Sequence, residues 1–272
     1  MICIAGKNNI AVDTMCCVLE LFDKSEIVAL TNDSDTGEDM WQRSFKKFCR
    51  NEYISISTLG ELYSIEDLIF LSLEYDRILK PSLFRSTKLF NIHFSKLPEY
   101  RGVYTSYWPI LNGEKESGVT LHEIDYGIDT GDIIDQITFA IAETDTAYDL
   151  YQKYIKYGTM LVKENLTSLF NRNFIPKPQG VDGASYYGKN SIDYPRLKLN
   201  FLQTAYNVRN QVRAFYFPAF QVPIFCRKKI ASCEVLDTRS TSKPGTLVEE
   251  CSGFFIVSTL DYDVKLHLDN VT

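Results

Sequence analysis

The chain lacks the features that mark several large classes of protein. Its 272 residues carry 29 Lys and Arg against 35 Asp and Glu, and the net charge of −6 argues against a broad basic surface for nucleic acid. No apolar run is long enough to span a bilayer, and no secretory leader precedes the cysteines. We therefore expect a cytoplasmic protein with neither nucleic-acid nor membrane partners.

Residues that bind metals or form disulfides are also sparse. The seven cysteines are odd in number and include no CxxC pair, which favours reduced thiols. With only three histidines and no paired cysteines, the sequence predicts no metal site. The dinucleotide fingerprint GxGxxG is absent as well, so a nicotinamide cofactor is disfavoured.

The N-terminal segment has the pattern of a βαβ unit. Residues 2–6 form a short apolar run, residues 10–22 have a helical pattern, and residues 27–32 form a second apolar run. This order predicts a parallel sheet. The turn at residues 7–9 offers backbone N–H groups at a helix N-terminus to an anion such as phosphate, although an ordinary solvated turn is the alternative.

The most informative stretch runs from residue 91 to residue 134. Its first apolar run reads as a central strand, in which Asn91 and His93 point to the same face. Polar residues inside a buried strand are costly unless they are satisfied or functional. His122, in the next strand-like run, is predicted to be structural. Asp129 lies in the acidic loop that follows, and we expect it to complete a constellation with Asn91 and His93.

Four motifs follow one another in this stretch. They are Asn91-Ile92-His93, Ser95-Lys96-Leu97-Pro98-Glu99-Tyr100-Arg101-Gly102, Gly118-Val119-Thr120 and Asp129-Thr130-Gly131-Asp132. Together they resemble the N10-formyltetrahydrofolate-dependent formyltransferases, and the similarity is greatest to the bacterial dTDP-amino-sugar N-formyltransferases. Weaker similarity extends from residue 1 to about residue 180. A match this dense is far more specific than a single short motif.

The resemblance implies an α/β fold in two parts. A Rossmann-like parallel-sheet formyltransferase domain would occupy residues 1–180, and a smaller, β-containing C-terminal subdomain would occupy residues 181–272. The residues agree with this division, because two prolines and two glycines at 176–183 mark a boundary. Short strand-like runs separated by polar turns then follow residue 224.

The resemblance also implies a mechanism and a co-substrate. Formyl transfer to an amine passes through a tetrahedral intermediate whose oxygen gains negative charge. Asn91 would donate a hydrogen bond to that oxygen, His93 would take the amine proton, and Asp129 would orient His93 or favour its charged form. The co-substrate would be N10-formyltetrahydrofolate, with no metal. The candidates for folate binding are Arg77, Ile78, Leu79 and Asp125.

The candidates for nucleotide-sugar binding come from both ends of the chain. The resemblance places the turn at residues 7–9 on the phosphate side of the amine substrate. A helix predicted from about 199 to 213 would present Arg209 and Arg213 on one face, where guanidiniums suit phosphate and nearby aromatic rings suit a base. A second apolar core under a solvated helix is the alternative. The candidates are Lys7, Asn8, Asn9, Tyr187, Arg209, Arg213 and Phe217.

The function implied by the resemblance is sugar N-formylation for a surface polysaccharide such as a lipopolysaccharide O-antigen. The acceptor would be a dTDP-linked 3-amino-3,6-dideoxyhexose rather than the 4-amino sugar, although no residue decides between them. The expected partners are a small-molecule nucleotide sugar, folate and a second copy in a homodimer. One alternative is methionyl-tRNA formyltransferase, against which the nearly neutral charge after residue 180 argues. The other is an inactive folate- or nucleotide-binding module, which would not need all three catalytic residues.

Overall fold

The computed structural model describes residues 1–194 and 197–269. The chain forms two compact units, each assembled from segments that are separate in the sequence. Unit 1 comprises Met1–Gly102, Gly118–Phe139 and Lys153–Tyr186, and unit 2 comprises Val103–Ser117, Ala140–Gln152 and Tyr187–Thr272. Within the described ranges, no helix has both the length and the apolar character needed to cross a membrane.

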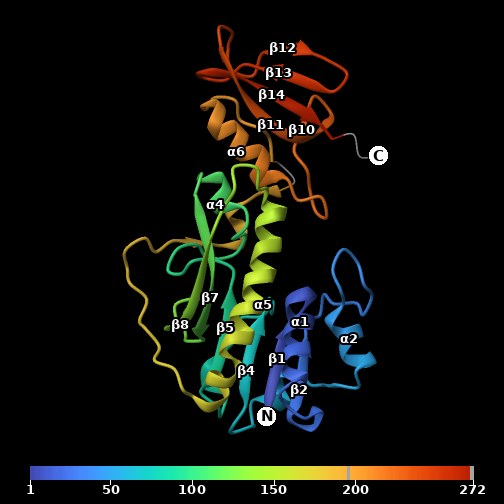
Figure 1. Cartoon of the computed structure of the whole chain (residues 1–272), viewed down its shortest axis with the longest axis vertical. Coiled ribbons are helices and arrows are strands. Elements are labelled where there is room, and N and C mark those ends of the chain that lie inside the picture. Colours follow the sequence, from blue (N-terminus) through green and yellow to red (C-terminus); the bar gives the residue numbers. More distant parts are fainter. Residues whose placement is uncertain (195–196, 270–272) are drawn as a thin grey trace. The chain divides into compact units, whose positions relative to one another are not determined.

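Unit 1 is built around a seven-stranded sheet in the order β3-β2-β1-β4-β5-β7-β8 (Figure 1). The first five strands of this order are parallel, and β7 runs antiparallel to β5. The strand order reverses between β1 and β4, and ligands of open α/β sheets bind beside such a reversal, outside the carboxyl ends of the strands. The strands are β1 (Ile2–Gly6), β2 (Ile27–Thr31), β3 (Ser55–Ile56), β4 (Ile69–Leu73), β5 (Lys88–His93), β7 (Glu116–Glu123) and β8 (Ile133–Ala140).

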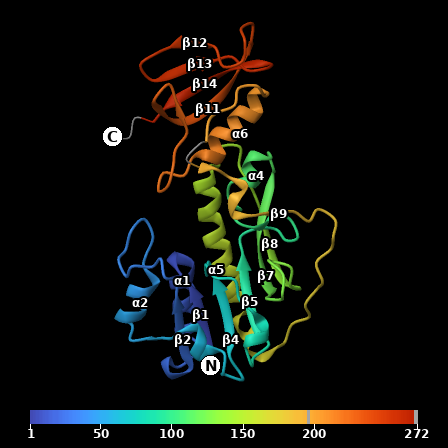
Figure 2. The same cartoon turned by 180° about the vertical axis from the view of Figure 1, so that it is seen from behind.

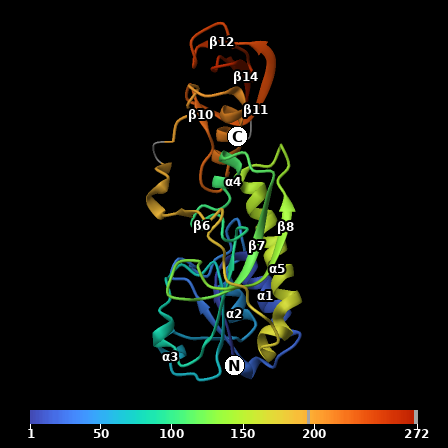
Figure 3. The same cartoon turned by 90° about the vertical axis from the view of Figure 1, so that its left-hand side faces the viewer.

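Helices cover both faces of this sheet. Every residue of β1 and β4 is buried, as expected for parallel strands with layers on both sides. Figure 3 shows α1 and α5 on one side of the strands and α3 on the other. The helices are α1 (Asn8–Leu19), α2 (Phe45–Asn51), α3 (Leu59–Leu62) and α5 (Ala147–Asn171), with 3-10 turns η1 (Lys24–Glu26) and η2 (Pro81–Leu83).

Apolar packing on the two faces fixes the position of β5. On the α3 face, Leu62 packs in a buried cluster with Val28 and Phe70. On the α5 face, the Tyr154 ring stacks on Phe94, with ring centroids 5.3 Å apart. Each buried side chain of this size contributes roughly 1.5–3 kcal/mol. The strand that carries Asn91 and His93 is therefore held rigidly between two packed layers.

Unit 2 is built on a five-stranded antiparallel sheet in the order β10-β11-β14-β13-β12 (Figure 2). Helix α6 covers one face, where Val208 and Val212 join a buried cluster with Phe255 and Leu266. The elements are α4 (Trp108–Leu111), η3 (Lys189–Ser191), α6 (Ala205–Phe215), β10 (Ile224–Phe225), β11 (Lys228–Arg239), β12 (Leu247–Glu250), β13 (Phe254–Val257) and β14 (Tyr262–Leu268). A short third sheet pairs β6 (Arg101–Gly102) with β9 (Tyr186–Tyr187).

The predicted fold class is confirmed: an α/β fold with a mostly parallel sheet and a separate β-rich sheet late in the chain. The predicted helix at 199–213 begins later, at Ala205. Thr204 caps it by accepting a hydrogen bond from the Asn207 backbone N–H at 3.3 Å, and Asp261 accepts one from the Ala205 N–H at 2.7 Å. These two acceptors satisfy N–H groups that a helix leaves unpaired at its start, which sets the boundary.

Candidate active site

Asn91 and His93 lie near the carboxyl end of β5, two positions apart and thus on one face of the sheet. Strand β7 pairs with β5 so that Asn91 lies opposite His122 and His93 lies opposite Thr120. The antiparallel register therefore brings two histidines together, with ring centroids 6.4 Å apart. Two strands from different parts of the sequence thus supply three polar side chains to one end of the sheet.

The contacts of His93 fix the role of each ring nitrogen. Its Nε2 lies 2.9 Å from the backbone carbonyl oxygen of Tyr100, and a carbonyl only accepts, so Nε2 carries a hydrogen. Its Nδ1 faces Oδ1 of Asp129 at 3.5 Å. Nδ1 is therefore the nitrogen that can take up a proton. The carboxylate of Asp129 lies next to this nitrogen.

Asp129 sits in a tightly closed loop. Its φ is +54°, which is uncommon for a residue with a side chain. Its Oδ2 accepts a hydrogen bond from the Gly102 N–H at 2.9 Å, while Oδ1 lies 3.5 Å from His93 Nδ1 and 3.7 Å from His122 Nε2. Two residues on, a Cβ on Gly131 would lie 1.8 Å from the carbonyl oxygen of residue 123, so only glycine fits there. The loop thus brings the carboxylate close to both imidazoles.

His122 orients the amide of Asn91. Its Nδ1 donates to the backbone carbonyl of Glu123 at 2.7 Å, and its Nε2 lies 3.1 Å from Nδ2 of Asn91. Burial lowers the pKa of His122 from 6.5 to about 4, against the opposing effect of Asp129. The neutral ring accepts at Nε2, so it turns the NH₂ end of the Asn91 amide toward itself. One amide hydrogen is used in this contact, and within the described ranges the second has no protein partner.

The three predicted catalytic residues are thus brought together, and their arrangement suits acyl transfer to an amine. His93 lies 3.5 Å from Asp129, and His122 links Asn91 to the same carboxylate through contacts of 3.1 and 3.7 Å. The side chains of His93 and Asp129 are only 8% and 14% exposed, which strengthens their electrostatic interaction. Among residues 1–194 and 197–269, no group of three or more His, Cys, Asp or Glu is placed to hold a metal ion.

The first three folate candidates follow the carboxyl end of β4, the strand next to β5. Arg77 forms an exposed ion pair with Asp33. Ile78 is 76% exposed, and Leu79 packs partly buried against the core on the α3 side of the sheet. This segment therefore presents peptide groups and one uncovered apolar side chain, a set that fits an aromatic ring with hydrogen-bonding edges. Its role in folate binding stays a prediction.

The fourth folate candidate, Asp125, organises the loop that carries Asp129. Its Oδ1 accepts hydrogen bonds from the Gly127 N–H at 3.0 Å and from the Thr130 hydroxyl at 2.7 Å. Both bonds run within the loop that follows β7, so they stabilise its conformation. A contact between Asp125 and folate stays a prediction, and the observed contacts show that this residue also has a structural role.

The turn at residues 7–9 leads from β1 into α1. Asn8 has φ of +65°, and its Nδ2 donates to the Glu74 carboxylate at 3.1 Å. The Oδ1 of Asn9 accepts two hydrogen bonds from Arg43, both at 3.1 Å. The two asparagines are therefore engaged within the protein, and Lys7 supplies the positive charge at the N-terminus of α1. Phosphate binding by this turn stays a prediction.

The two predicted arginines of α6 have different surroundings in unit 2. Arg213 is buried, and its guanidinium donates to the backbone carbonyls of Asp145 and Ala142, each at 2.8 Å. Arg209 lies 3.6 Å from the Glu143 carboxylate, and among residues 1–194 and 197–269 its buried Nε–H has no hydrogen-bond partner. Arg213 thus serves the structure of unit 2, whereas the Arg209 side chain stays 19% exposed.

The two predicted aromatic contacts of unit 2 already pack against other rings. Tyr187 stacks on Trp108, with centroids 4.2 Å apart and planes 21° from parallel. Phe217 is buried, and the rings of Tyr148 and Tyr151 meet it edge-on, each with a centroid distance of 5.5 Å. One face of Tyr187 is therefore covered, and any stacking on a base would use its other face. Both substrate roles stay predictions.

Two residues near Asp129 were not assigned a functional role from the sequence. His122 was predicted to be structural, and only the strand register, which places it opposite Asn91, points to its contact with the site. Gln179 donates to the backbone carbonyls of Asp129 at 2.9 Å and of Gly131 at 2.7 Å. It lies about 50 residues further along the chain, in a segment whose prolines and glycines predict a linker, so no local pattern signals this contact.

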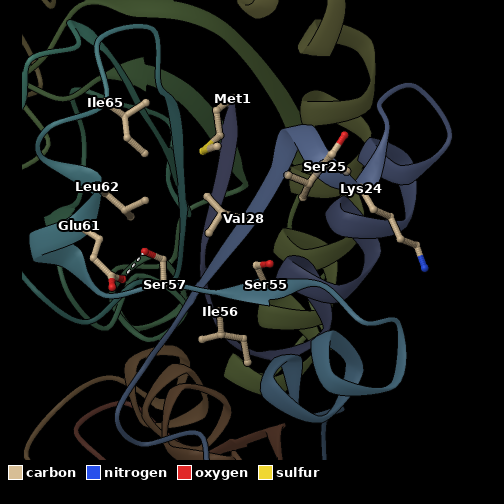
Figure 4. Close-up of a pocket in the computed structure, with 11 residues that line it drawn as sticks. Met1, Lys24, Ser25, Val28, Ser55, Ile56, Ser57, Glu61, Leu62 and Ile65 are labelled. Carbon is tan, nitrogen blue, oxygen red and sulfur yellow. Dashed lines mark hydrogen bonds between the residues drawn. The ribbon is translucent and has the colours of Figure 1, made fainter.

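A separate pocket of about 360 Å³ lies at the starts of β1 and β2 and beside β3 (Figure 4). Among its polar residues, Glu61 accepts hydrogen bonds from the Ser57 hydroxyl and the Thr58 N–H, both at 2.8 Å, and so caps helix α3. The pocket therefore has no arrangement of polar groups comparable with the one around His93. Its lining residues are Met1, Lys24, Ser25, Ile27, Val28, Ser55, Ile56, Ser57, Glu61, Leu62 and Ile65.

Two solved structures resemble the chain over nearly its whole length. One is an N-formyltransferase from Helicobacter canadensis in complex with folinic acid and dTDP-3-aminofucose. It is 41% identical, with a TM-score of 0.91, over 98% of this chain and 99% of that one. The other is the sugar 3N-formyltransferase WlaRD, crystallised with dTDP and 5-N-formyl-THF. It is 44% identical, with a TM-score of 0.93, over 100% of this chain and 98% of that one.

Sequence comparison leads to the same family. The chain is 36% identical over 196 residues to the methionyl-tRNA formyltransferase of Fervidobacterium nodosum. The aligned residues cover 69% of this chain and 61% of that protein. The family model described as "Formyl transferase" matches residues 27–165, just over half of the chain. This matched segment includes Asn91, His93, His122 and Asp129. The chain therefore belongs to the formyl transferase family.

Proposed function

We propose that the chain is a sugar N-formyltransferase that formylates the amino group of a dTDP-linked dideoxyamino sugar. The observation that carries the proposal is the group of Asn91, His93 and Asp129 at the carboxyl end of β5, within the fold of this family. Two solved relatives support the substrate class, because they match the chain from end to end and were crystallised with a dTDP sugar or dTDP and a folate.

In this proposal N10-formyltetrahydrofolate supplies the formyl group, and the protein positions it and moves protons. Nδ1 of His93 takes the proton from the attacking amine, because Nε2 is occupied by its hydrogen bond to Tyr100. As the bond between the formyl carbon and N10 breaks, His93 passes this proton to N10, and tetrahydrofolate leaves. Asp129 stabilises the charged ring from 3.5 Å. Asn91 donates its remaining amide hydrogen to the formyl oxygen as negative charge develops there.

The remaining candidates would bind the two substrates. We propose that Arg77, Ile78, Leu79 and Asp125 contact the folate, since they belong to loops next to the carboxyl end of the sheet. Lys7, Asn8 and Asn9 would lie on the phosphate side, with Lys7 supplying the charge. Tyr187, Arg209, Arg213 and Phe217 would bind the nucleotide or shape its site. Among them Arg209 is the strongest candidate for direct contact, because its side chain is partly exposed, whereas Arg213 donates to two backbone carbonyls.

Residues 1–180 would form the catalytic domain, and residues 181–272 would contribute nucleotide-sugar contacts, a homodimer interface or both. We propose a 3-amino-3,6-dideoxyhexose as acceptor, because both solved relatives described above carry a 3-amino sugar or a 3N activity in their descriptions. Such a product suits a surface polysaccharide such as an O-antigen, made in the cytoplasm.

Methionyl-tRNA formylation is the second candidate, because a curated relative of that name is 36% identical. That protein is matched over only 61% of its length. In addition, a chain with a net charge of −6 is poorly suited to bind a polyanion. These observations favour the small-molecule substrate.

The test is a substrate panel with the purified protein. N10-formyltetrahydrofolate is mixed with dTDP-linked 3-amino sugars, dTDP-linked 4-amino sugars or charged initiator tRNA. Release of tetrahydrofolate is followed together with the mass of the acceptor. We expect formyl transfer to a 3-amino sugar and none to tRNA, and no transfer with His93→Asn. Transfer to tRNA alone, or to none of these acceptors, would contradict the proposal.

A further inference from the structure

The side chain of Gln179 connects the loop of Asp129 to Arg101. Its Nε2 donates to the carbonyl oxygens of Asp129 and Gly131, at 2.9 and 2.7 Å. Its Oε1 accepts from Nε and Nη2 of Arg101, at 3.1 and 2.6 Å. A guanidinium only donates and a carbonyl only accepts, so the orientation of the Gln179 amide is determined by its partners. The Gln179 side chain thus links the loop of Asp129 to Arg101.

The same arginine adjoins the residue that holds the carboxylate itself. Gly102, the next residue, donates its N–H to Oδ2 of Asp129 at 2.9 Å. The segment of Gln179 is aligned with this loop by a backbone bridge, because Ile133 and Lys177 exchange two N–H to carbonyl hydrogen bonds of 2.8 Å. Asp129 is therefore held at two points: its side chain by Gly102, and its peptide by Gln179.

This double attachment matters because Asp129 has an uncommon backbone conformation. The left-handed conformation, which Asp129 adopts with φ of +54°, costs most residues about 1–2 kcal/mol, and aspartate tolerates it better than most. Such a residue persists only where its surroundings fix it, and strained residues cluster at functional sites. The two hydrogen bonds from Gln179 act on the carbonyls of residues 129 and 131 and so hold the loop in this conformation. Without them the loop could relax and turn the carboxylate away from His93.

We propose that Arg101 and Gln179 are positioning residues that hold the Asp129 carboxylate against His93 for proton transfer, an inference that rests on the proposed formyl transfer. Neither side chain need touch a substrate. Arg101 fixes the Gln179 amide, the amide fixes the loop, and the loop fixes Oδ1 of Asp129. Removing either residue weakens the alignment of the proton acceptor in the transition state and leaves substrate binding nearly unchanged.

The first test compares Gln179→Met with the wild type, since methionine has similar length and no hydrogen-bonding amide. We expect kcat to fall about 10–100-fold with each KM within about threefold, because a displacement near 1 Å can cost 10²-fold in rate. Arg101→Met should act in the same direction. The double variant should lose little more than the worse single one, because the two residues act in series. Gln152→Met on α5 is the matched control and should leave both constants unchanged.

A second measurement does not depend on activity. Hydrogen exchange, followed by mass spectrometry in peptides that cover residues 99–104 and 124–133, reports on the Gly102 N–H and on the loop. We expect faster exchange there in Gln179→Met and Arg101→Met, with melting temperatures that show a folded protein. Unchanged exchange, or kcat within twofold of wild type in a folded Gln179→Met protein, would overturn the proposal. A wild-type protein that transfers no formyl group would contradict the proposed function, while the exchange data would still decide whether the loop is held.

Discussion

The catalytic group and the predicted nucleotide-binding group differ in what their side chains contact. Around β5, Asn91 contacts His122, and both His93 and His122 face Asp129. In unit 2 the predicted residues contact their own framework. Arg213 donates to the carbonyls of residues 142 and 145, and Tyr187 stacks on Trp108. The predicted catalytic residues and His122 form a network of mutual contacts, whereas the predicted nucleotide-binding residues contact residues outside their own group.

This difference reflects what each group has to do. Proton transfer needs donors and acceptors fixed relative to one another, so the residues that perform it must meet in the folded chain. Recognition of a nucleotide sugar can be spread over many weak contacts, each from a residue that also serves packing. Substitutions in the two groups should therefore change different kinetic constants, and the predictions below use that difference.

The largest effect is expected at His93 and Asp129. His93→Asn removes the proton acceptor and should lower kcat by ~10²–10⁴-fold with a much smaller change in KM. Asp129→Asn keeps the shape, removes the charge that favours the protonated ring, and should also lower kcat heavily. The loss in the double variant should be well below the product of the two single losses, because the residues act as one unit. Steady-state kinetics on the three variants measures these effects.

The matched control for this set is His267→Asn, which changes a partly exposed histidine of β14 in unit 2. It should leave kcat unchanged, and circular dichroism should show that all variants are folded. Near-normal kcat in folded His93→Asn would contradict the proposed proton acceptor. Fully multiplicative losses would show that His93 and Asp129 act separately. The predicted catalytic residues would then not differ from the predicted nucleotide-binding residues in acting as one unit.

A somewhat smaller loss is expected at Asn91. Asn91→Ala removes the proposed donor to the formyl oxygen and should lower kcat on the order of 10²–10³-fold. Asn91→Asp keeps the size but replaces the donor by an acceptor, and it should be no better than alanine. The measurement is kcat for formyl transfer to the best sugar of the panel. Full activity in Asn91→Asp would exclude Asn91 as the oxyanion donor.

The sequence was sufficient to predict that Asn91, His93 and Asp129 come together, because this part of the geometry follows from local rules, while their catalytic role stays a prediction. Strand periodicity puts Asn91 and His93 on one face, and the short loop after β7 returns Asp129 to them. His122 required the pairing register of β5 and β7, which spacing alone does not give. Gln179 required a contact between residues about 50 positions apart, within a segment that has the composition of a linker. Long-range contacts of this kind are decided by tertiary packing.

The parallel sheet was likewise predictable, because β1 and β4 are continuous apolar runs separated by helical patterns. The surroundings of Arg213 were not predictable. The i, i+4 spacing correctly suggests that Arg209 and Arg213 share one side of α6. It does not show that the backbone carbonyls of residues 142 and 145 accept hydrogen bonds from Arg213. Helical periodicity predicts which way a side chain points and leaves its partner undetermined.

A moderate effect should separate these two arginines. Arg209→Ala should raise the KM for the nucleotide sugar about tenfold and leave the KM for formyl-folate unchanged, because its partly exposed guanidinium is proposed to meet the substrate. Arg213→Ala should instead lower the free energy of unfolding by about 3 kcal/mol, because two backbone carbonyls, one of them buried, lose a charged donor. Kinetics and urea unfolding on both variants measure this contrast. A KM effect shared equally by both substrates, or present only in Arg213→Ala, would contradict the assignment.

The smallest effect concerns the pH dependence of stability and sharpens the comparison within the catalytic group. Burial lowers the pKa of His122 to about 4 in the folded chain, against 6.5 for an unperturbed histidine. As pH falls from 6.5 toward 4, the unfolded chain binds this proton first, so protonation favours unfolding. The stability that neutral His122 contributes is therefore complete above pH 6.5 and declines through that window.

His122→Gln cannot be protonated, so its free energy of unfolding should change less between pH 7 and pH 5 than that of the wild type. Urea unfolding at both pH values measures the difference, with His267→Gln as the exposed control. An equal pH dependence in the wild type and His122→Gln would mean that His122 is charged or solvated in the folded protein, and the orientation assigned to the Asn91 amide would then be wrong.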